Sequence, residues 1–212
     1  MRYQNVCLEA FGYTLPEEVV TTAEIEQRLA PLYSRLRLPE GRLELMTGIR
    51  ERRFWPAEMP PSEASIVSAA RAVAAAEIDP REIGVLIHGS VCRDQLEPAT
   101  ACRVHHQLGL REDCAVYDVS NACLGVLSGI VQIANMIELG QVRAGLVVGT
   151  ENGRQLVDST IAQLNQNTKL TRQDIKLAIA SLTIGSASCA VLVTHRDLSK
   201  TQNRLHAAAA RA

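Results

Sequence analysis

The chain has 212 residues, of which 47% are hydrophobic and 21% charged, a composition typical of a globular protein with one large domain or two small ones. Its net charge of −1 gives no general attraction to nucleic acid or to an anionic membrane, and an aromatic content of 3% disfavours a base-stacking surface. The six cysteines form no C-x-x-C pair and lie mostly in apolar segments. We therefore expect free thiols in a reducing, cytoplasmic compartment, with no disulfide framework and no metal site.

The residues Met1 to Asn5 contain no apolar core of the kind that a signal peptide has.

Two helices are predicted in the first 80 residues. Thr21-Thr22-Ala23-Glu24 has the chemistry of a capping box, which indicates the start of the first helix. A second helix is predicted from Ser62 to about Ala76, where alanine is abundant.

The central part of the chain alternates between strands and helices. Apolar runs recur about every 30 residues, which is the size of a βαβ unit, at Gly84–His88, Ala115–Val119 and Ala144–Val148. One helix is predicted to open at Pro98 and run to about Leu108, and another to run from Ala122 to Leu139, where Gly140 ends it. Polar residues interrupt the uncharged stretch 119–137, so we interpret it as a core helix and not as a membrane span. Nearly continuous apolar strands predict an α/β fold whose sheet is covered on both faces.

The last 60 residues predict helices, a strand and the beginning of a further strand that is not completed. Residues 151–183 have the pattern of inserted helices, and Ser186–Val193 is predicted to be a strand. Arg204-Leu205-His206-Ala207 could open another strand, but the sequence stops at Ala212. We therefore expect one domain over residues 1–200 and, in 201–212, the start of a further half that this sequence does not include.

Cys123 is the first candidate functional residue. It follows the apolar run that ends at Val119 and precedes the uncharged helix, so a thiol is expected at a strand-to-helix junction. Backbone N–H groups and the helix dipole favour a thiolate at such a position, and a thiolate is the nucleophile in covalent acyl chemistry. The alternative is that Cys123 is a small buried hydrophobic residue, as many free cysteines are.

Several segments together resemble the N-terminal half of the thiolase superfamily, on its ketoacyl synthase III branch. The T-G-I-x-x-R-R element of that branch is matched by Thr47 to Arg53, and its D-x-x-x-A-C-x-G nucleophile segment by Tyr117 to Gly125. Further matches are Ala144 to Gly149 followed by Glu151, and Thr183 to Ser188, where the branch has a glycine-rich turn. Within the branch, Ser90 to Thr100 is most similar to the bacterial olefin-pathway condensing enzymes. The resemblance implies the N-terminal half of a thiolase-like fold, with a mixed sheet between two layers of helices.

The resemblance also implies an activity, which is Claisen condensation of acyl thioesters through an acyl-Cys123 intermediate. Two fatty acyl-CoA molecules are the expected substrates, and a malonyl-carrier-protein-dependent 3-oxoacyl synthase is the alternative. No other cofactor is expected. In the family a histidine and an asparagine of the C-terminal half complete the site, so we expect this chain alone to turn over poorly. The implied partners are acyl-CoA or acyl carrier protein and a second copy of the chain or a chain supplying the C-terminal half. A non-catalytic module that only dimerises or pairs remains a third possibility.

Glu97 is the second candidate. Its simplest interpretation is an acid before Pro98 that stabilises a helix N-terminus by about 0.3–1 kcal/mol. The resemblance implies another role, because the matching glutamate of the olefin-pathway enzymes reaches across the dimer interface to remove the α-proton of the second acyl chain. An apolar acyl tunnel would raise the pKa of such a carboxyl, which suits a general base.

Basic residues and histidines supply the remaining candidates. Arg50, Arg52 and Arg53 could bind the CoA phosphates, or they could lie in a solvated turn. His88 ends a strand and could pair with Cys123, or it could be a core histidine. Cys102 and His106 have the i, i+4 spacing of a metal pair, but two ligands alone are weak support for a metal site.

Overall fold

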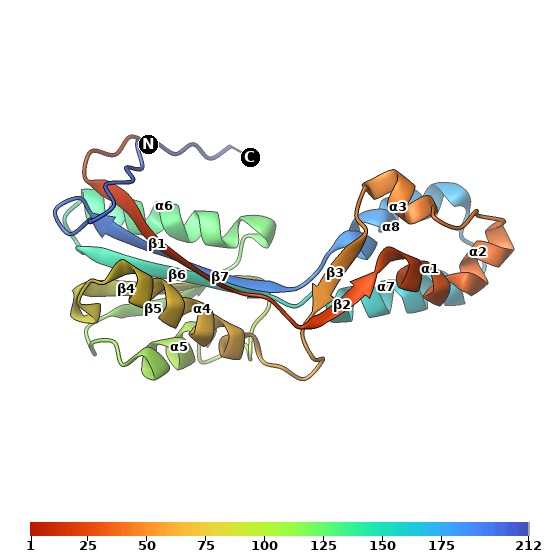
Figure 1. Cartoon of the computed structure of the whole chain (residues 1–212), viewed down its shortest axis with the longest axis horizontal. Coiled ribbons are helices and arrows are strands. Elements are labelled where there is room, and N and C mark those ends of the chain that lie inside the picture. Colours follow the sequence, from red (N-terminus) through yellow and green to blue (C-terminus); the bar gives the residue numbers. More distant parts are fainter. Residues whose placement is uncertain (212) are drawn as a thin grey trace. The chain divides into compact units, whose positions relative to one another are not determined.

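The computed structural model describes residues 1–211, which form two compact units (Figure 1). Unit 1 is built from Met1–Thr14, Pro60–Glu151 and the chain from Ser188 onward, and unit 2 from Leu15–Met59 and Asn152–Ala187. Each unit is therefore assembled from segments that are distant in the sequence. The prediction of one domain over residues 1–200 followed by the start of a further half stays a prediction.

Unit 1 is organised around a five-stranded mixed sheet. Its strand order is β1 (Val6–Thr14), β7 (Ala187–His195), β6 (Ala144–Glu151), β4 (Ile83–Gly89) and β5 (Ala115–Val119). β4 pairs in parallel with both β5 and β6, whereas β1 pairs antiparallel with β7. The predicted mixed sheet is confirmed, as are the four strands expected from apolar runs. β1 was not predicted, because Glu9 and Gly12 interrupt its apolar pattern.

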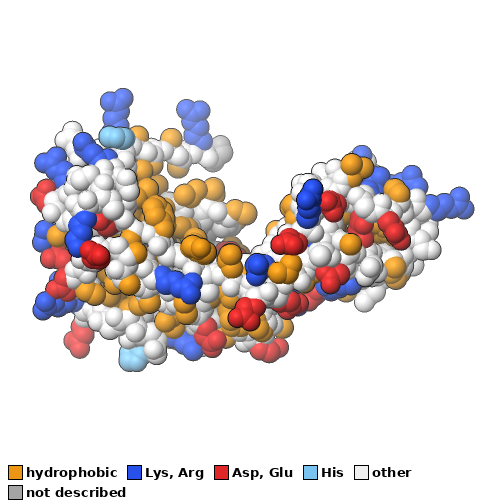
Figure 2. Space-filling view, viewed as in Figure 1, with side chains coloured by type: hydrophobic (Ala, Val, Ile, Leu, Met, Phe, Trp, Pro, Cys, Tyr) orange, Lys and Arg blue, Asp and Glu red, His pale blue; other side chains and the backbone are white. Residues whose placement is uncertain are grey.

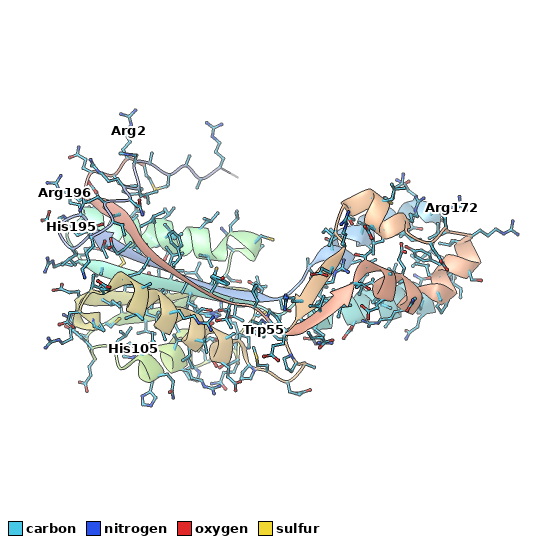
Figure 3. The ribbon with its side chains drawn as sticks, in the orientation of Figure 1. Arg2, Trp55, His105, Arg172, His195 and Arg196 are labelled. Atoms are coloured by element: carbon cyan, nitrogen blue, oxygen red, sulfur yellow. The ribbon has the colours of Figure 1, made fainter. Side chains whose placement is uncertain are left out.

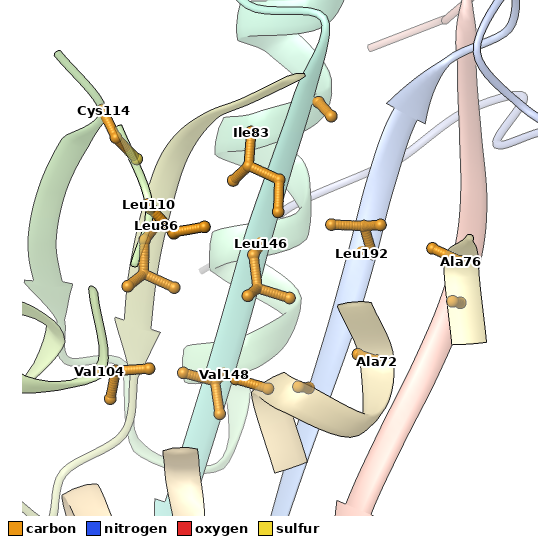
Figure 4. Packing of buried hydrophobic residues seen from close by; sticks show 14 of the residues in the cluster. Ala72, Ala76, Ile83, Leu86, Val104, Leu110, Cys114, Leu146, Val148 and Leu192 are labelled. Carbon is orange, nitrogen blue, oxygen red and sulfur yellow. The ribbon is translucent and has the colours of Figure 1, made fainter. Parts of the chain in front are cut away.

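Helices cover both faces of this sheet. α4 (Pro61–Ala76) and α5 (Thr100–Leu108) lie on one face, and α6 (Gly125–Glu138) lies on the other (Figure 1). Successive strand residues point to opposite faces, so Leu86, Leu146 and Leu192 pack beneath α4 and α5 (Figure 4). Their neighbours Ile87, Val147 and Val193 pack against α6 on the opposite face. Each such side chain is fully buried and contributes about 1.5–3 kcal/mol to folding.

Two helices begin later than the sequence predicts. The helix expected at Pro98 begins at Thr100, because its first amides are bound there by a side chain of β5. The helix expected at Ala122 starts as a 3₁₀ turn, Ala122–Leu124, and becomes α-helical at Gly125. Ala122 has a φ of 43°, which a right-handed α-helix does not contain.

Unit 2 contains a two-stranded sheet and five helices, including those predicted in residues 151–183. Its strands β2 (Glu18–Thr21) and β3 (Glu51–Phe54) pair antiparallel. The helices are α1 (Thr22–Arg28), α2 (Ala30–Leu36), α3 (Arg42–Thr47), α7 (Arg154–Gln166) and α8 (Arg172–Thr183). The predicted capping box is confirmed, since the Glu24 amide donates to the Thr21 hydroxyl at 3.1 Å and the Thr21 amide to the Glu24 carboxylate at 2.6 Å. The prediction of helices in 151–183 is confirmed as well.

The segment after β7 returns to the N-terminus of the chain. The Tyr3 amide donates to the His206 carbonyl at 2.9 Å, and the Leu205 amide donates to the Val6 carbonyl at 3.0 Å. These contacts form isolated bridges, so the new strand expected near Arg204 is wrong as a regular element. Within residues 1–211, every helix is too short or too polar to cross a membrane.

Candidate active site

Cys123 lies at the predicted junction and is exposed. It is the middle residue of the 3₁₀ turn between β5 and α6, which the Leu124 amide closes by donating to the Asn121 carbonyl at 2.8 Å. The left-handed φ of Ala122 costs about 1–3 kcal/mol, which the surrounding packing must offset. Because the thiol is exposed, the alternative that Cys123 is a buried hydrophobic residue is wrong.

A close backbone contact fixes this turn against the sheet. A Cβ atom on Gly125 would lie 2.6 Å from the Gly89 carbonyl oxygen, and one on Gly89 would lie 2.6 Å from the Gly125 carbonyl oxygen. Only glycine at both positions lets the start of α6 approach the end of β4 so closely. The turn that presents Cys123 is therefore held by backbone packing, two residues away from the thiol.

Glu97 lies in the segment between β4 and α5 and is also exposed. It makes no hydrogen bond or ion pair with residues 1–211, and the first α5 amides are bound by Asp118, so Glu97 does not cap α5 through a hydrogen bond. Its interpretation as an acid that stabilises the helix N-terminus through its charge stays a prediction. Leu96 beside it is 88% exposed. The structure thus leaves the carboxylate available at the surface of unit 1, and the expected apolar tunnel around it stays a prediction.

A buried polar cluster, which sequence reasoning missed, lies under the Glu97 segment. Asp118, whose side chain is only 9% exposed, accepts from the amides of Thr100 at 2.8 Å and Ala101 at 2.9 Å and forms an ion pair with Arg93. A second group of buried hydrogen bonds in unit 1 joins the Thr150 hydroxyl to Ser65 at 2.6 Å and to Ser188 at 2.8 Å. The signal was an acidic residue inside the apolar run of β5, because an acid in a sheet covered on both faces needs partners.

The three candidate arginines have different surroundings in unit 2. Arg50 is exposed and lies 3.5 Å from Glu44, which fits the solvated turn. Arg52 is 6% exposed and donates to the Val20 carbonyl at 3.5 Å, and burial lowers the pKa of its guanidinium. Arg53 donates to the Pro16 carbonyl at 2.8 Å. Adjacent residues of a strand point to opposite faces, so Arg52 and Arg53 do not converge on one phosphate. Phosphate binding by these residues stays a prediction.

Unit 2 also contains an open cavity of about 650 Å³ formed by α1, α2 and α3. Glu26 lines it and accepts from the amides of Gly41 at 2.7 Å and Leu43 at 2.6 Å and from the Tyr33 hydroxyl at 2.9 Å. Burial, with the Glu26 carboxylate beside it, raises the pKa of Tyr33. None of the three candidate arginines lines this cavity.

The histidines do not support a pair with Cys123. The His88 side chain is fully buried, and neither ring nitrogen has a hydrogen-bond partner within residues 1–211, so the alternative of a Cys123–His88 pair is wrong. Burial lowers the pKa of His88, although the Asp118 charge opposes this. On α5, His105 lies 2.9 Å from the Arg111 carbonyl oxygen through its Nε2, and His195 ends β7 (Figure 3).

The other cysteines differ in environment. Burial raises the pKa of Cys114 to about 11 and also raises the pKa of Cys189. Cys102 is exposed on α5 together with His106. In the part of the chain that the structure describes, no three histidine, cysteine or acidic side chains gather as a metal site would require.

Apolar side chains are exposed around the start of α6. Leu124 is 53% exposed and Leu127 is 58% exposed, so the predicted burial of this helix is incomplete. Phe11 and Tyr13 of β1 are 58% and 65% exposed. Figure 2 shows hydrophobic side chains at the surface of unit 1 beside α6. Exposed apolar residues grouped in this way are typical of an interaction surface.

Comparison with known proteins identifies the relatives of this chain. The acyl-CoA:acyl-CoA alkyltransferase of Shewanella oneidensis is 48% identical over 206 residues, which are 97% of this chain and 58% of that protein. The enzyme of the same name from Xanthomonas campestris is 33% identical over 93% of this chain and 58% of its own length. A β-ketoacyl-[acyl-carrier-protein] synthase III of Bacillus pumilus is 30% identical over 73% of this chain and 47% of its own length. The chain thus spans less than two thirds of the length of these curated relatives.

Solved structures agree with these matches. The acetamide-bound OleA of Xanthomonas campestris superimposes with a TM-score of 0.86 at 32% identity, over 94% of this chain and 61% of that chain. The 3-oxoacyl-(acyl carrier protein) synthase III, FabH, of Xanthomonas oryzae gives a TM-score of 0.86 at 32% identity, over 94% of this chain and 59% of that chain. Residues 46–203 match the family model described as the thiolase N-terminal domain. Since this match covers well over half of the sequence, the chain belongs to the thiolase family.

Proposed function

We propose that this chain carries the nucleophile of an acyltransferase that joins two fatty acyl-CoA molecules by Claisen condensation. The observation that carries the proposal is the exposed thiol of Cys123 at the β5–α6 junction, in a chain 48% identical to an acyl-CoA:acyl-CoA alkyltransferase. The substrates are the thioesters themselves, and no further cofactor is required for this chemistry.

In the first stage, Cys123 takes the acyl group. The Cys123 sulfur attacks the thioester carbonyl, a new C–S bond forms, and the bond to the CoA sulfur breaks. The CoA thiolate leaves and takes up the proton that Cys123 lost. The N–H groups at the start of α6 and the helix dipole favour negative charge near this turn.

In the second stage, Glu97 of a neighbouring subunit removes the α-proton of the second acyl-CoA. The resulting carbanion attacks the acyl-Cys123 carbonyl, so that a C–C bond forms and the C–S bond to Cys123 breaks. The products are a β-ketoacyl thioester and the restored thiolate. The exposure of Glu97 and its lack of partners within residues 1–211 support a role outside its own unit.

A malonyl-dependent 3-oxoacyl synthase is the second candidate, supported by the similarity to the Bacillus pumilus enzyme and to FabH. Such an enzyme obtains its carbanion by losing CO₂ and needs no carboxylate base. The presence of Glu97 therefore favours the acyl-CoA reaction. A non-catalytic pairing module is a third candidate, because the chain spans only 58% of its alkyltransferase relatives.

Acylation of Cys123 tests the proposal. Incubation with a fatty acyl-CoA should add one acyl mass to the peptide that contains Cys123, and Cys123→Ser should abolish that addition. Cys102 is also exposed and serves as the internal control for nonspecific thiol labelling. Equal labelling of Cys102 and Cys123, or undiminished labelling of the Cys123→Ser protein, would favour the non-catalytic module.

A further inference from the structure

The segment that carries Glu97 has an exposed tip and fixed ends. Residues 95–98 at the tip are all exposed. At the first end, the Ser90 hydroxyl donates to the Thr150 carbonyl at 2.7 Å, and the Val91 amide donates to the Glu151 carboxylate at 3.0 Å. These bonds attach the beginning of the segment to β6. The position of the Glu97 carboxylate therefore depends on how the rest of the segment is held.

Asp118 binds both sides of that segment at once. Before the tip, Arg93 forms an ion pair with the Asp118 carboxylate. After the tip, the amides of Thr100 and Ala101 donate to separate oxygens of the same carboxylate, at 2.8 and 2.9 Å. Capping α5 requires only the two amide bonds. The additional ion pair with Arg93 joins the residues before the tip to those after it through one carboxylate. We call this arrangement of Asp118, Arg93 and the two α5 amides the clamp.

A second carboxylate strengthens this closure. The Asp94 amide donates to the Thr100 hydroxyl at 3.2 Å, and the Asp94 carboxylate accepts from the Ser62 amide at 2.9 Å. These contacts bring the two sides of the loop together and attach them to α4. Asp118 differs from Asp94 because it belongs to β5, five residues before Cys123.

We propose that Asp118 is a positioning residue, which holds the Glu97 segment in a fixed place relative to the strand and turn that present Cys123. This inference rests on the proposed function, in which Glu97 supplies the base and Cys123 the nucleophile. The Asp118 carboxylate contacts Arg93 and the amides of Thr100 and Ala101, so its proposed effect on the reaction is transmitted through the loop. A carboxylate is suited to this position because two oxygens accept two amides and a guanidinium together.

Hydrogen exchange of the Asp118→Asn protein tests the clamp without any turnover. Asparagine keeps the shape of the side chain but has one acceptor oxygen and no charge. The amides of residues 92–101 should exchange faster, and those of β6 should be unchanged. Asp113→Asn is the matched control, because Asp113 also pairs with an arginine, Arg111, but is 72% exposed. Unchanged exchange in residues 92–101 of the Asp118→Asn protein would overturn the proposal.

Kinetics of an enzyme completed by the remaining thiolase-like half then separate positioning from general structural damage. Asp118→Asn should leave the rate of Cys123 acylation within about threefold of the original and lower condensation by about 10–100-fold, as misplaced catalytic groups do. In the Glu97→Gln background, Asp118→Asn should cause little further loss, since both changes act through Glu97. Parallel loss of acylation and condensation, or a full additive loss in the double variant, would overturn the proposal.

The outcomes also distinguish failure of the inference from failure of the proposed function. If Glu97→Gln does not affect condensation, the proposed role of Glu97 is wrong, and with it the positioning role of Asp118. If Asp118→Asn protein does not fold, Arg93→Gln replaces it, because this change opens one side of the clamp and leaves the α5 amides bound. Arg93→Gln should accelerate exchange in residues 91–97 but not in α5, and equal protection of residues 91–97 would overturn the clamp.

Discussion

Glu97 is the residue that separates the two candidate reactions. Glu97→Gln preserves the size of the side chain and removes the basic group. In an enzyme completed by the C-terminal half, we expect acylation of Cys123 to be nearly intact and condensation of two acyl-CoA molecules to fall by about 10²–10⁴-fold, the usual contribution of a general base. Condensation with a malonyl thioester, measured in the same product assay, should fall much less because decarboxylation supplies the carbanion.

The control for this change is Glu112→Gln, since Glu112 is exposed in the turn before β5. It removes one surface carboxylate of unit 1 without touching the Glu97 segment. If Glu97→Gln slows both donor types equally, or blocks acylation itself, then Glu97 contributes to binding or structure, and the olefin-type reaction loses its main support.

His88 makes the stability of the fold depend on pH. Burial lowers the pKa of His88 in the folded protein below its ordinary value of about 6.5. Below pH 6.5 the unfolded chain takes up a proton that the folded chain resists, so this group lowers the free energy of unfolding as the pH falls. Above pH 6.5 both states are neutral at this position, and the contribution is constant.

Urea unfolding from pH 8 to pH 5 measures this effect. His88→Leu should give a shallower loss of stability below pH 6.5 than the original protein. His106→Gln is the control, because His106 is exposed on α5. An identical pH slope for the His88→Leu protein would show that His88 is not the group that titrates differently in the two states.

At the scale of elements, the contact between Gly89 and Gly125 decides where α6 begins. A methyl group on Gly125 would lie 2.6 Å from the Gly89 carbonyl oxygen, so Gly125→Ala must displace the helix start from β4. We expect a loss of about 1–3 kcal/mol in the free energy of unfolding, as overpacking usually costs. Because Cys123 lies two residues before Gly125, its alkylation rate by iodoacetamide should change as well.

Gly140→Ala, at the other end of the same helix, is the matched control. A Cβ atom there meets nothing within 4 Å, and the only cost is the left-handed φ of 72°, about 1–2 kcal/mol. It should leave Cys123 alkylation unchanged. Unchanged alkylation in the Gly125→Ala protein would indicate that the turn is positioned by other contacts.

Sequence periodicity predicted the elements whose pattern is local. β4, β5, β6 and β7 were found because each is a nearly continuous apolar run, and α1 because Thr21 and Glu24 form a capping box. The three-residue helix η1 (Pro80–Glu82) and the short β2 and β3 were not predicted, because they are too short to show a period. The position of Cys123 at the junction was correct for the same local reason.

The supporting polar cluster could not be predicted in the same way. Its bonds join residues that are 17 to 85 positions apart, such as Asp118 with Ala101 and Ser65 with Thr150. The residue type indicated only that the Asp118 carboxylate needs hydrogen-bond or charged partners. Which partners it has depends on the parallel pairing of β4 with β5, which brings the end of one strand beside the end of the other.

At the scale of the whole molecule, the chain does not complete one unit before it begins the other. The chain leaves unit 1 after Thr14 and returns at Pro60, then leaves again after Glu151 and returns at Ser188. Glu9 of β1 binds the segment that follows β7, because its carboxylate accepts from the Ser199 hydroxyl at 2.5 Å and the Lys200 amide at 2.9 Å. Sequence periodicity does not reveal these changes from one unit to the other, since the helices of an inserted segment have the same pattern as any other helix.

The apolar surface beside Cys123 gives the last prediction. Leu127 of α6 is 58% exposed, within the uncharged stretch 119–137, and such a face is usually covered by another polypeptide. We expect a second copy of the chain, or further thiolase-like polypeptide, to bind there. Leu127→Glu should weaken self-association by about tenfold or more in sedimentation velocity, because burying an unpaired charge costs more than the roughly 1.4 kcal/mol of a tenfold change.

Leu177→Glu places the same charge on α8 of unit 2, where Leu177 is 83% exposed. If the α6 surface is the binding surface, this control should associate like the original protein. Equal sedimentation of the two variants, or a monomeric original protein at every concentration, would show that the α6 surface does not mediate self-association.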